Sequence, residues 1–311
     1  MRQGQALLNG KWTGNQHGGV KTPQALMLPD PATRFARTAA RLDAFSAGHP
    51  MAQWLDFMAR LARAQHAVAG MMGPLGSPSP IELEDAAEMT PPIAANDHRR
   101  APIWRQGLAL LLDGLDIGPA PAPVRLVMAS LRDREIDAQE ALADDVLHGS
   151  VGTADVGAAV FATAALQVYF THLAASLPAS SLHLLPRRGL CPCCGSTPVC
   201  GVVSDSGPVR GARYLHCSLC GTAWNHVRAV CITCRQSRSL ALREIEGDSG
   251  AAKLETCDDC GTYAKMFYQA KDVGVDPIAD DLATLGLDVL AGEEGWSRHA
   301  PNPFLMLSQR P

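Results

Sequence analysis

Cysteine pairs repeat at a fixed interval in the C-terminal part of this chain. Ten of its 311 residues are cysteines, and none of them precedes residue 191. Eight form four Cys-x-x-Cys pairs, and adding 40 to each position of the first two pairs gives the positions of the last two. These are Cys191, Cys194, Cys217, Cys220, Cys231, Cys234, Cys257 and Cys260. A fixed period of this kind indicates the duplication of one small module.

The spacing within each pair suits metal binding. A Cys-x-x-Cys turn points two sulfurs to one side, and two facing turns give a tetrahedral four-thiolate site. The duplication predicts pairing within each module, so that 191/194 lie with 217/220 and 231/234 with 257/260. A module of about 40 residues builds little core of its own, so the bound metal supplies folding free energy.

The residues alone leave the metal open. Zinc is the commonest ion in four-thiolate sites and is favoured on that ground. A single iron ion uses the same ligands, and the segment CPCCG at 191–195 is similar to a rubredoxin loop. Redox-active thioredoxin-type pairs and iron–sulfur clusters are disfavoured, because the βαβ context of the first and the usual spacings of the second are missing.

Four residues near these pairs are expected to play lesser parts. Cys193 and Cys200 stand outside the repeat, because Thr233 and Leu240 occupy the corresponding positions forty residues later. We expect both to be small, inert thiols. His216 and His226 flank the second pair, but four sulfurs already complete a tetrahedron. We therefore expect structural or surface roles for the two histidines.

The rest of the chain reads as mainly helical. Apolar residues recur at helical spacing between positions 31 and 180, interrupted by a stretch rich in Pro, Gly and Ser at 71–100 that should be a long loop. Short β-prone runs occur only after residue 190, at 199–203, 223–229, 240–245 and 263–268. The predicted fold is therefore mainly α with small β modules. Its parts are a flexible tail (1–30), an all-helical domain (31–186), two rubredoxin-like or zinc-ribbon-like modules (187–229 and 230–275) and a C-terminal helix and tail (276–311).

One uncharged stretch, at 156–177, is long enough to span a bilayer. It is built largely from alanine, which contributes little insertion energy, so a helix buried in a bundle is the better interpretation. The start of the chain shows no secretory signal. We therefore expect a cytoplasmic protein without membrane insertion, whose thiols stay reduced.

Charge is distributed unevenly over the cysteine-rich part. Residues 201–243 hold six arginines and one acid, a net +5, whereas residues 244–294 hold thirteen acids and three lysines, a net −10. Two interpretations stay open, a solvated surface or a protein-docking surface with opposite potentials at its two ends. The overall charge of −4 argues against a dedicated nucleic-acid binder.

Three longer segments of the chain resemble the FdhE family, the cytoplasmic accessory proteins of formate dehydrogenases. They are GARYLHCSLCGTAWNHVRAVC at 211–231, LETCDDCGTYAKMFYQAKD at 254–272 and DPIADDLATLGLDVLAGEEGW at 276–296. The CPCCG segment and Asn302-Pro303-Phe304 agree with this resemblance, and Asp280 and Asp281 match a family motif.

The resemblance implies a helical domain followed by two rubredoxin-like modules that hold iron rather than zinc. It implies that the eight paired cysteines are the metal ligands. It also implies a non-enzymatic maturation factor, needed for active formate dehydrogenase, that binds the catalytic subunit of that enzyme before export. Two other hypotheses remain at this point, a rubredoxin-like electron-transfer or redox-sensing protein and a zinc-ribbon nucleic-acid-binding module.

Overall fold

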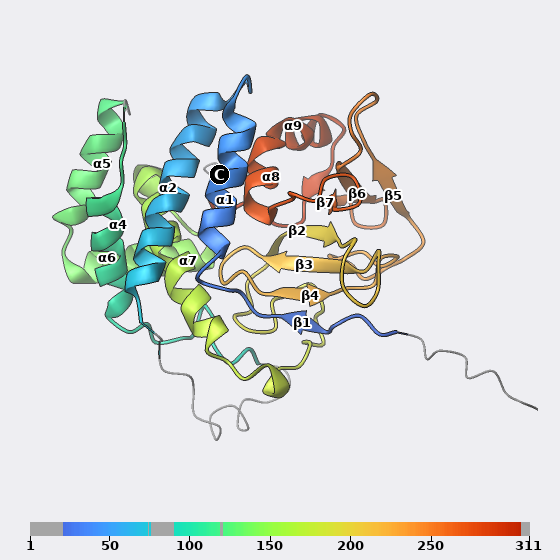
Figure 1. Cartoon of the computed structure of the whole chain (residues 1–311), viewed down its shortest axis with the longest axis horizontal. Helices are drawn as coiled ribbons and strands as arrows, with labels where there is room; N and C mark the ends of the chain where they lie inside the picture. The colour runs from blue at the N-terminus through green and yellow to red at the C-terminus, as the bar shows by residue number, and fades with distance from the viewer. Residues whose placement is uncertain (1–20, 74, 76–89, 119–120, 306–311) are drawn as a thin grey trace, which may run out of the picture.

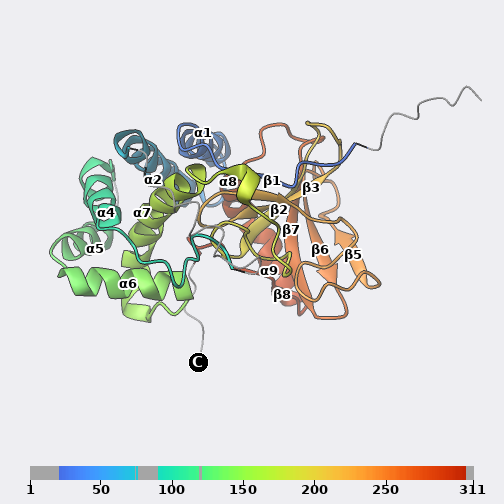
Figure 2. The same ribbon diagram turned by 90° about the horizontal axis from the view of Figure 1, so that it is seen from below.

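A computed structural model describes residues 21–73, 75, 90–118 and 121–305. Helices occupy one side of the molecule and a sheet the other, with two short C-terminal helices against the sheet (Figure 1). The same division is visible after a quarter turn, with α5 at one extreme and β5 at the other (Figure 2).

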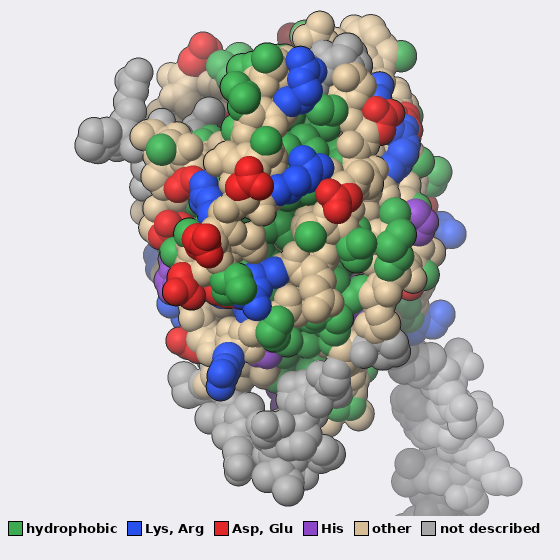
Figure 3. All heavy atoms as spheres, turned by 90° about the vertical axis from the view of Figure 1, so that its left-hand side faces the viewer, with side chains coloured by type: hydrophobic (Ala, Val, Ile, Leu, Met, Phe, Trp, Pro, Cys, Tyr) green, Lys and Arg blue, Asp and Glu red, His purple; other side chains and the backbone are tan. Residues whose placement is uncertain are grey.

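The N-terminal part forms a helical domain around one central helix. Its α-helices within the described ranges are α1 (Arg34–Ser46), α2 (Ala52–Met71), α4 (Ile103–Gly114), α5 (Ala122–Arg132), α6 (Ile136–His148) and α7 (Val156–Ala175), with short 3₁₀ turns at Thr153–Asp155 and Ala179–Ser181. Helices α2, α4, α5 and α6 all pack against α7. Acidic and basic side chains are intermixed on the face farthest from the sheet (Figure 3).

Helix α7 is the apolar stretch noted in the sequence. By length and composition it is the one helix in the described part of the chain that could cross a membrane. Of its most apolar run of 18 residues, however, 83% is buried inside the protein. Small alanine side chains let neighbouring helices approach closely, which suits a helix covered on all sides. Its placement is therefore that of a core helix, as the sequence predicts.

The C-terminal part, together with β1 from the N-terminal segment, forms an eight-stranded sheet. Its strands are β1 (Leu26–Met27), β2 (Pro198–Val203), β3 (Arg213–Cys217), β4 (Ala223–Asn225), β5 (Leu240–Arg243), β6 (Ala252–Cys257), β7 (Thr262–Tyr268) and β8 (Ser297–Arg298). The order across the sheet is β1-β4-β3-β2-β7-β6-β5, and β8 pairs with β7. Each module contributes three antiparallel strands.

The two modules join through one parallel pair of strands, in which Gly201 of β2 lies beside Met266 of β7. A residue with a side chain would not fit at position 201, because a Cβ added to Gly201 would lie 2.5 Å from Met266 Sδ. The two modules thus share one continuous sheet.

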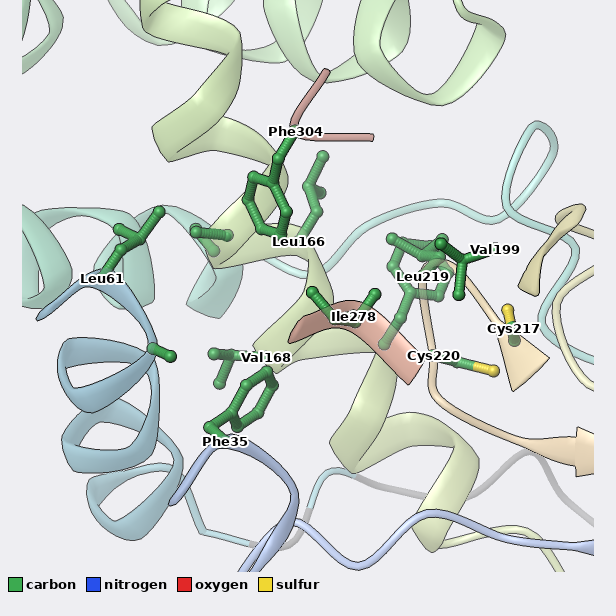
Figure 4. Close-up of a cluster of buried hydrophobic side chains, with 14 of the residues drawn as sticks. Phe35, Leu61, Leu166, Val168, Val199, Cys217, Leu219, Cys220, Ile278 and Phe304 are labelled. Atoms are coloured by element: carbon green, nitrogen blue, oxygen red, sulfur yellow. The ribbon is translucent and has the colours of Figure 1, made fainter. Parts of the chain in front are cut away.

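A hydrophobic cluster continues from the helical domain into the modules. Phe35 of α1 and Val168 of α7 face Ile278 of the C-terminal helix α8, while Leu219 and Val199 of the first module lie on its other side (Figure 4). The sulfur-bearing turn at Cys217 and Cys220 belongs to the same cluster. The first module therefore packs directly on the helical domain.

Buried carboxylates on α8 add a polar connection between these parts. The Asp276 side chain caps α8 by accepting from the backbone N–H groups of Ile278 and Ala279, and it also accepts from Thr38 of α1. Asp280 accepts from Arg41 of α1. Hydrogen bonds to Asp276, and the ion pair of Asp280 with Arg41, offset the cost of burying these two carboxylates.

The second half of this network is centred on the fully buried Asp281. Its carboxylate pairs with Lys265 of β7 and Arg298 of β8, and it accepts from Asn302. Both family-motif acids thus lie inside the molecule, where Asp280 connects α8 to the helical domain and Asp281 connects α8 to the second module and the C-terminal segment.

Some details of the sequence-based expectation differ from the structure. The C-terminal helical segment consists of two helices, α8 (Pro277–Ala283) and α9 (Leu285–Glu293). The prediction of a flexible tail over 1–30 is wrong for Leu26 and Met27, which pair with Trp224 and Ala223 of β4. Residues 1–20 lie outside the described part, as do residues 74 and 76–89 of the long loop predicted at 71–100.

Candidate metal centres

The structure brings the eight paired cysteines together in two groups of four. Cys191, Cys194, Cys217 and Cys220 form the first group, and Cys231, Cys234, Cys257 and Cys260 form the second. Within each group all four sulfurs lie within 4.8 Å of one another. These are the sets that the duplication predicts, so each group belongs to a single module.

The sulfur separations fit a tetrahedral four-thiolate site. The nearest Sγ–Sγ distances are 3.4 Å (Cys194–Cys217) and 3.5 Å (Cys191–Cys220) in the first group. They are 3.6 Å (Cys234–Cys257) and 3.8 Å (Cys231–Cys260) in the second. A metal–sulfur bond of about 2.3 Å puts the sulfurs of a regular tetrahedron about 3.8 Å apart. All eight thiols are free, and these distances are far longer than the roughly 2.05 Å of a disulfide.

Matching backbone turns present the sulfurs in both modules. The N–H of Cys191 donates to the carbonyl of Ser196, and the N–H of Cys231 donates to that of Gln236, each at 2.9 Å. Both turns then place a residue at positive φ, Gly195 at 75° and Arg235 at 66°. Arg235 is the one non-glycine residue at positive φ among those described, so the second module holds strain that the first avoids.

The helical domain holds both turns of the first group. The carbonyls of Cys193 and Cys194 accept from the N–H groups of Ile93 and Ala95, at 3.0 and 2.9 Å. In the other turn, Gln167 Nε2 of α7 donates to the carbonyl of Ser218 at 2.8 Å. The first group is thus positioned from outside its own module.

Arg34 of α1 places a partly buried positive charge beside the first group. Its Nη1 donates to the carbonyl of Leu219 at 2.9 Å and to Thr171 Oγ1 of α7. The guanidinium lies directly over Gly221, where a Cβ would come within 2.7 Å of its central carbon. Burial lowers the pKa of Arg34, and the nearby thiols of Cys220 and Cys217 oppose that effect. Because a four-thiolate site is anionic with Zn²⁺ or iron, this cation offsets part of its charge.

The second group is more open and lacks a comparable neighbour. Cys234 and Cys260 are partly exposed, whereas all four cysteines of the first group are at most 2% exposed. Gly261, the counterpart of Gly221, has nothing within 4 Å of an added Cβ. The two duplicated modules therefore differ: the four-cysteine group of the first is closed to solvent, and that of the second is open.

Hydroxyl groups border one sulfur of each group at corresponding positions. Thr222 Oγ1 lies 3.2 Å from Cys220 Sγ, and Thr262 Oγ1 lies 3.1 Å from Cys260 Sγ. In the second module the contact extends outward, through Thr233 Oγ1 at 2.9 Å from Thr262 to His299 Nδ1 at 2.7 Å from Thr233. Both threonines belong to a Cys-Gly-Thr sequence that the two modules share, whereas no local signal pointed to His299 or to Arg34.

The two cysteines outside the repeat are buried. Cys193 Sγ accepts from Thr222 Oγ1 at 3.4 Å and lies beside the first group. Cys200 Sγ donates to the carbonyl of Pro277, and burial raises the pKa of its thiol well above the ordinary value. Cys200 therefore remains a neutral thiol within the fold.

The flanking histidines belong to the framework of the first module. His226 is buried, and its Nδ1 lies 2.6 Å from Arg213 Nη2. Burial and the neighbouring Arg213 lower the pKa of His226 to about 4. Burial, together with Arg37 and Arg34, lowers the pKa of His216 to about 4 as well. Both imidazoles are therefore neutral near pH 7.

The charge runs of the sequence are partly internal. Arg213 and Glu255 form a buried ion pair, and three acids of the negative run lie inside the network on α8. These buried charges contribute nothing to a docking surface. Exposed charges persist around β5, at Arg235, Arg238, Glu244, Glu246 and Asp248.

Comparison with known proteins identifies the family of this chain. Three family models match consecutive parts of the chain, "FdhE, N-terminal" at 23–186, "FdhE, central domain" at 190–228 and "FdhE, C-terminal domain" at 229–305. The chain belongs to the FdhE family. The FdhE homolog of Edwardsiella ictaluri is 40% identical over 294 residues, which are 94% of each chain. That of Serratia proteamaculans is 37% identical over 289 residues, or 92% of each chain.

A solved FdhE structure shares the fold. The crystal structure of the FdhE protein from Pseudomonas aeruginosa matches with a TM-score of 0.80 and 34% identity, over 91% of this chain and 99% of that one. The family resemblance drawn from the sequence is therefore confirmed, together with the mainly helical fold and its two tandem four-cysteine modules.

Proposed function

We propose that this FdhE-family protein is a cytoplasmic, non-catalytic accessory factor in formate dehydrogenase maturation. In this role it binds the catalytic subunit of that enzyme before export. The observation that carries the proposal is the pair of four-cysteine groups, one closed against the helical domain and one open, in a chain that three family models match between residues 23 and 305.

Both groups are proposed to hold one metal ion each through their four sulfurs. The sulfur separations suit iron and zinc alike, and the rubredoxin-like first turn together with the family resemblance favours iron. A bound iron ion would supply one-electron chemistry, whereas zinc would be purely structural. The chain's own contribution is to orient the sulfurs, to exclude water from the first group and to place Arg34 beside it.

The two four-cysteine groups differ in their surroundings, and this difference supports a role in binding a partner protein. The first group ties the module to the helical domain through contacts on both of its turns, so its metal would fix the relative placement of these parts. The second group lies at the other end of the sheet with two cysteines partly exposed. The open site is the one that a partner protein would meet.

A bacterial strain lacking its own FdhE gene provides the test. The wild-type chain should restore formate dehydrogenase activity, and it should co-purify without air with the immature catalytic subunit. Metal analysis of the same preparation should give two iron ions per chain. Full formate dehydrogenase activity without any FdhE protein, or no recovery of the subunit with this chain, would remove the basis for the proposal.

One observation favours a second candidate, electron transfer or redox sensing through the open site. Electron exchange needs a metal close to the surface, and Cys234 and Cys260 provide that exposure. A reversibly bleachable absorption band with a measurable potential, lost in Cys257→Ser and kept in Cys217→Ser, would support this function. A colourless protein containing only zinc would dispose of it.

A further inference from the structure

The sheet ends at β5, which pairs with β6 and has no strand on its other side within the part of the chain that the structure describes. β5 lies at the outer limit of the molecule, opposite the helical domain (Figure 2). Such an edge presents backbone N–H and C=O groups that can pair with a further strand.

The internal duplication shows what the corresponding edge does in the first module. Gly201 of β2 pairs with Leu215 of β3, and Leu242 of β5 pairs with Glu255 of β6, forty residues after Leu215. Leu242 therefore occupies the place of Gly201. The free side of Gly201 is filled by β7, which runs parallel to β2. The matching side of Leu242 is open.

The backbone of β5 is oriented to accept such a neighbour. The N–H of Asp258 donates to the carbonyl of Ser239 at 3.0 Å, so these residues form a hydrogen-bonded pair across β5 and β6. Hydrogen-bonded and non-hydrogen-bonded pairs alternate along an antiparallel ladder. Ala241 and Arg243 therefore bond to β6, whereas the N–H and C=O groups of Leu240 and Leu242 point outward.

Side chains around this edge define the chemistry of an occupant. Leu242 and Ile245 are 52% and 45% exposed, which gives the edge an apolar character. Three exposed acids follow the end of β5: Glu244, which is paired with Lys253, and Glu246 and Asp248, for which the described part of the chain shows no ion pair. A strand running parallel to β5, as β7 runs beside β2, would bring its own C-terminal end to these acids. The edge thus favours an extended apolar segment with basic residues at that end.

We propose that the open edge of β5 docks an extended segment of the immature formate dehydrogenase catalytic subunit by adding it to the sheet as a parallel strand. This inference rests on the proposed function and names the surface through which the protein would act. The docked strand would lie in the same module as the open four-cysteine group, whose Cys257 pairs directly with Leu240.

A proline at Leu242 tests the proposal at the backbone. Leu242→Pro removes an outward N–H and places a ring against the free edge, while leaving the bonds from Ala241 and Arg243 to β6 in place. Leu242→Val is the matched control, since it keeps both the N–H and the apolar side chain. Anaerobic binding of the purified, metal-loaded variants to the immature catalytic subunit should be about tenfold weaker or worse for Leu242→Pro, and unchanged for Leu242→Val.

Hydrogen exchange on the wild-type protein gives a second measurement that needs no variant. The amides of Leu240 and Leu242 should become protected when the catalytic subunit binds. Unchanged exchange at both amides in the complex, or wild-type affinity in a folded, metal-loaded Leu242→Pro variant, would overturn the edge proposal and leave the maturation role standing. Dissociation of a wild-type dimer by Leu242→Pro would assign the edge to a second copy and also overturn it. If the wild-type chain does not bind the subunit at all, both proposals fall.

Discussion

Arg213 and Glu255 form a bidentate ion pair between the two modules, with Arg213 Nη1 lying 2.6 and 2.8 Å from the two carboxylate oxygens. The side chains are only 1% and 9% exposed. Burial raises the pKa of Glu255, while the charge of Arg213 acts in the opposite direction. The pair therefore connects β3 to β6 in a region that water hardly reaches.

Breaking this pair should be costly. Arg213→Met leaves the Glu255 carboxylate buried and unpaired, which is expected to lower the free energy of unfolding by about 3–5 kcal/mol. The double variant Arg213→Met/Glu255→Leu removes both charges and should recover much of that loss. Denaturant unfolding of the metal-loaded proteins measures both. A double variant no more stable than Arg213→Met would contradict the pairing.

The two sulfur groups should release metal at different rates. A chelator should empty the open group first, because Cys234 and Cys260 are partly exposed and the first group is closed. Metal release should thus show two phases of equal amplitude. Cys257→Ser should remove the fast phase and Cys217→Ser the slow one, each variant binding about half the metal of the wild type. A single phase in the wild type, or unchanged metal content in both variants, would count against two independent sites.

Arg34 should matter for the closed site alone. Arg34→Met removes the partly buried cation beside Cys220 and Cys217, so the slow phase of metal release should accelerate while the fast phase stays the same. Arg34→Lys keeps the charge but loses the paired contacts to Thr171 and the carbonyl of Leu219, and it should give an intermediate rate. Acceleration of the fast phase would show that the arginine acts through general stability instead.

Stability should depend on pH through His226. The pKa of His226 is about 4 in the fold, against 6.5 for an ordinary histidine, so the unfolded chain takes up a proton in a pH range where the folded chain does not. The contribution is fully present above pH 6.5 and is lost as the pH falls toward 4, by up to roughly 3 kcal/mol. The stability difference between wild type and His226→Asn, measured by unfolding across this range, isolates the effect from acid release of metal. A constant difference would mean that His226 does not titrate as described.

The strained turn of the second module should be improved by glycine. Arg235→Gly removes the cost of a side chain at positive φ and is expected to raise the free energy of unfolding by about 1 kcal/mol, less the entropy that glycine loses on folding. The matched change, Gly195→Ala, introduces that cost in the first module and brings a Cβ within 3.1 Å of Pro91. Thermal unfolding should shift upward for the first variant and downward for the second. Equal shifts in one direction would not fit the proposed strain.

Much of the candidate site was predictable because its spacing is local and repeated. The offset of 40 residues was enough to group the eight cysteines. Arg34 could not be found in this way. It lies more than 150 residues from the first group along the chain, and only the packing of α1 on the module brings it there.

Strands were predictable where apolar residues dominate and were missed where charge is buried. β3 contains Arg213 and His216, and β6 contains Lys253 and Glu255, so both read as polar segments. Arg213 and Glu255 can be buried in these strands because each neutralises the other, whereas Lys253 is partly exposed and pairs with Glu244 just after β5. For the same reason the acidic run around Asp281 read as surface, although its partners Lys265 and Arg298 enclose it.

The pairing of β1 with β4 has a consequence for how the protein is made. Leu26 leaves the ribosome early, but its partner Trp224 follows about 200 residues later, so at roughly 5–20 residues per second the first strand waits some 10–40 seconds for its place in the sheet. During that time the helices between them can assemble, whereas the edge of β4 does not yet exist. The N-terminal segment is therefore among the last parts to fold into place. When β1 pairs with β4, all four cysteines of the first group have already been synthesised.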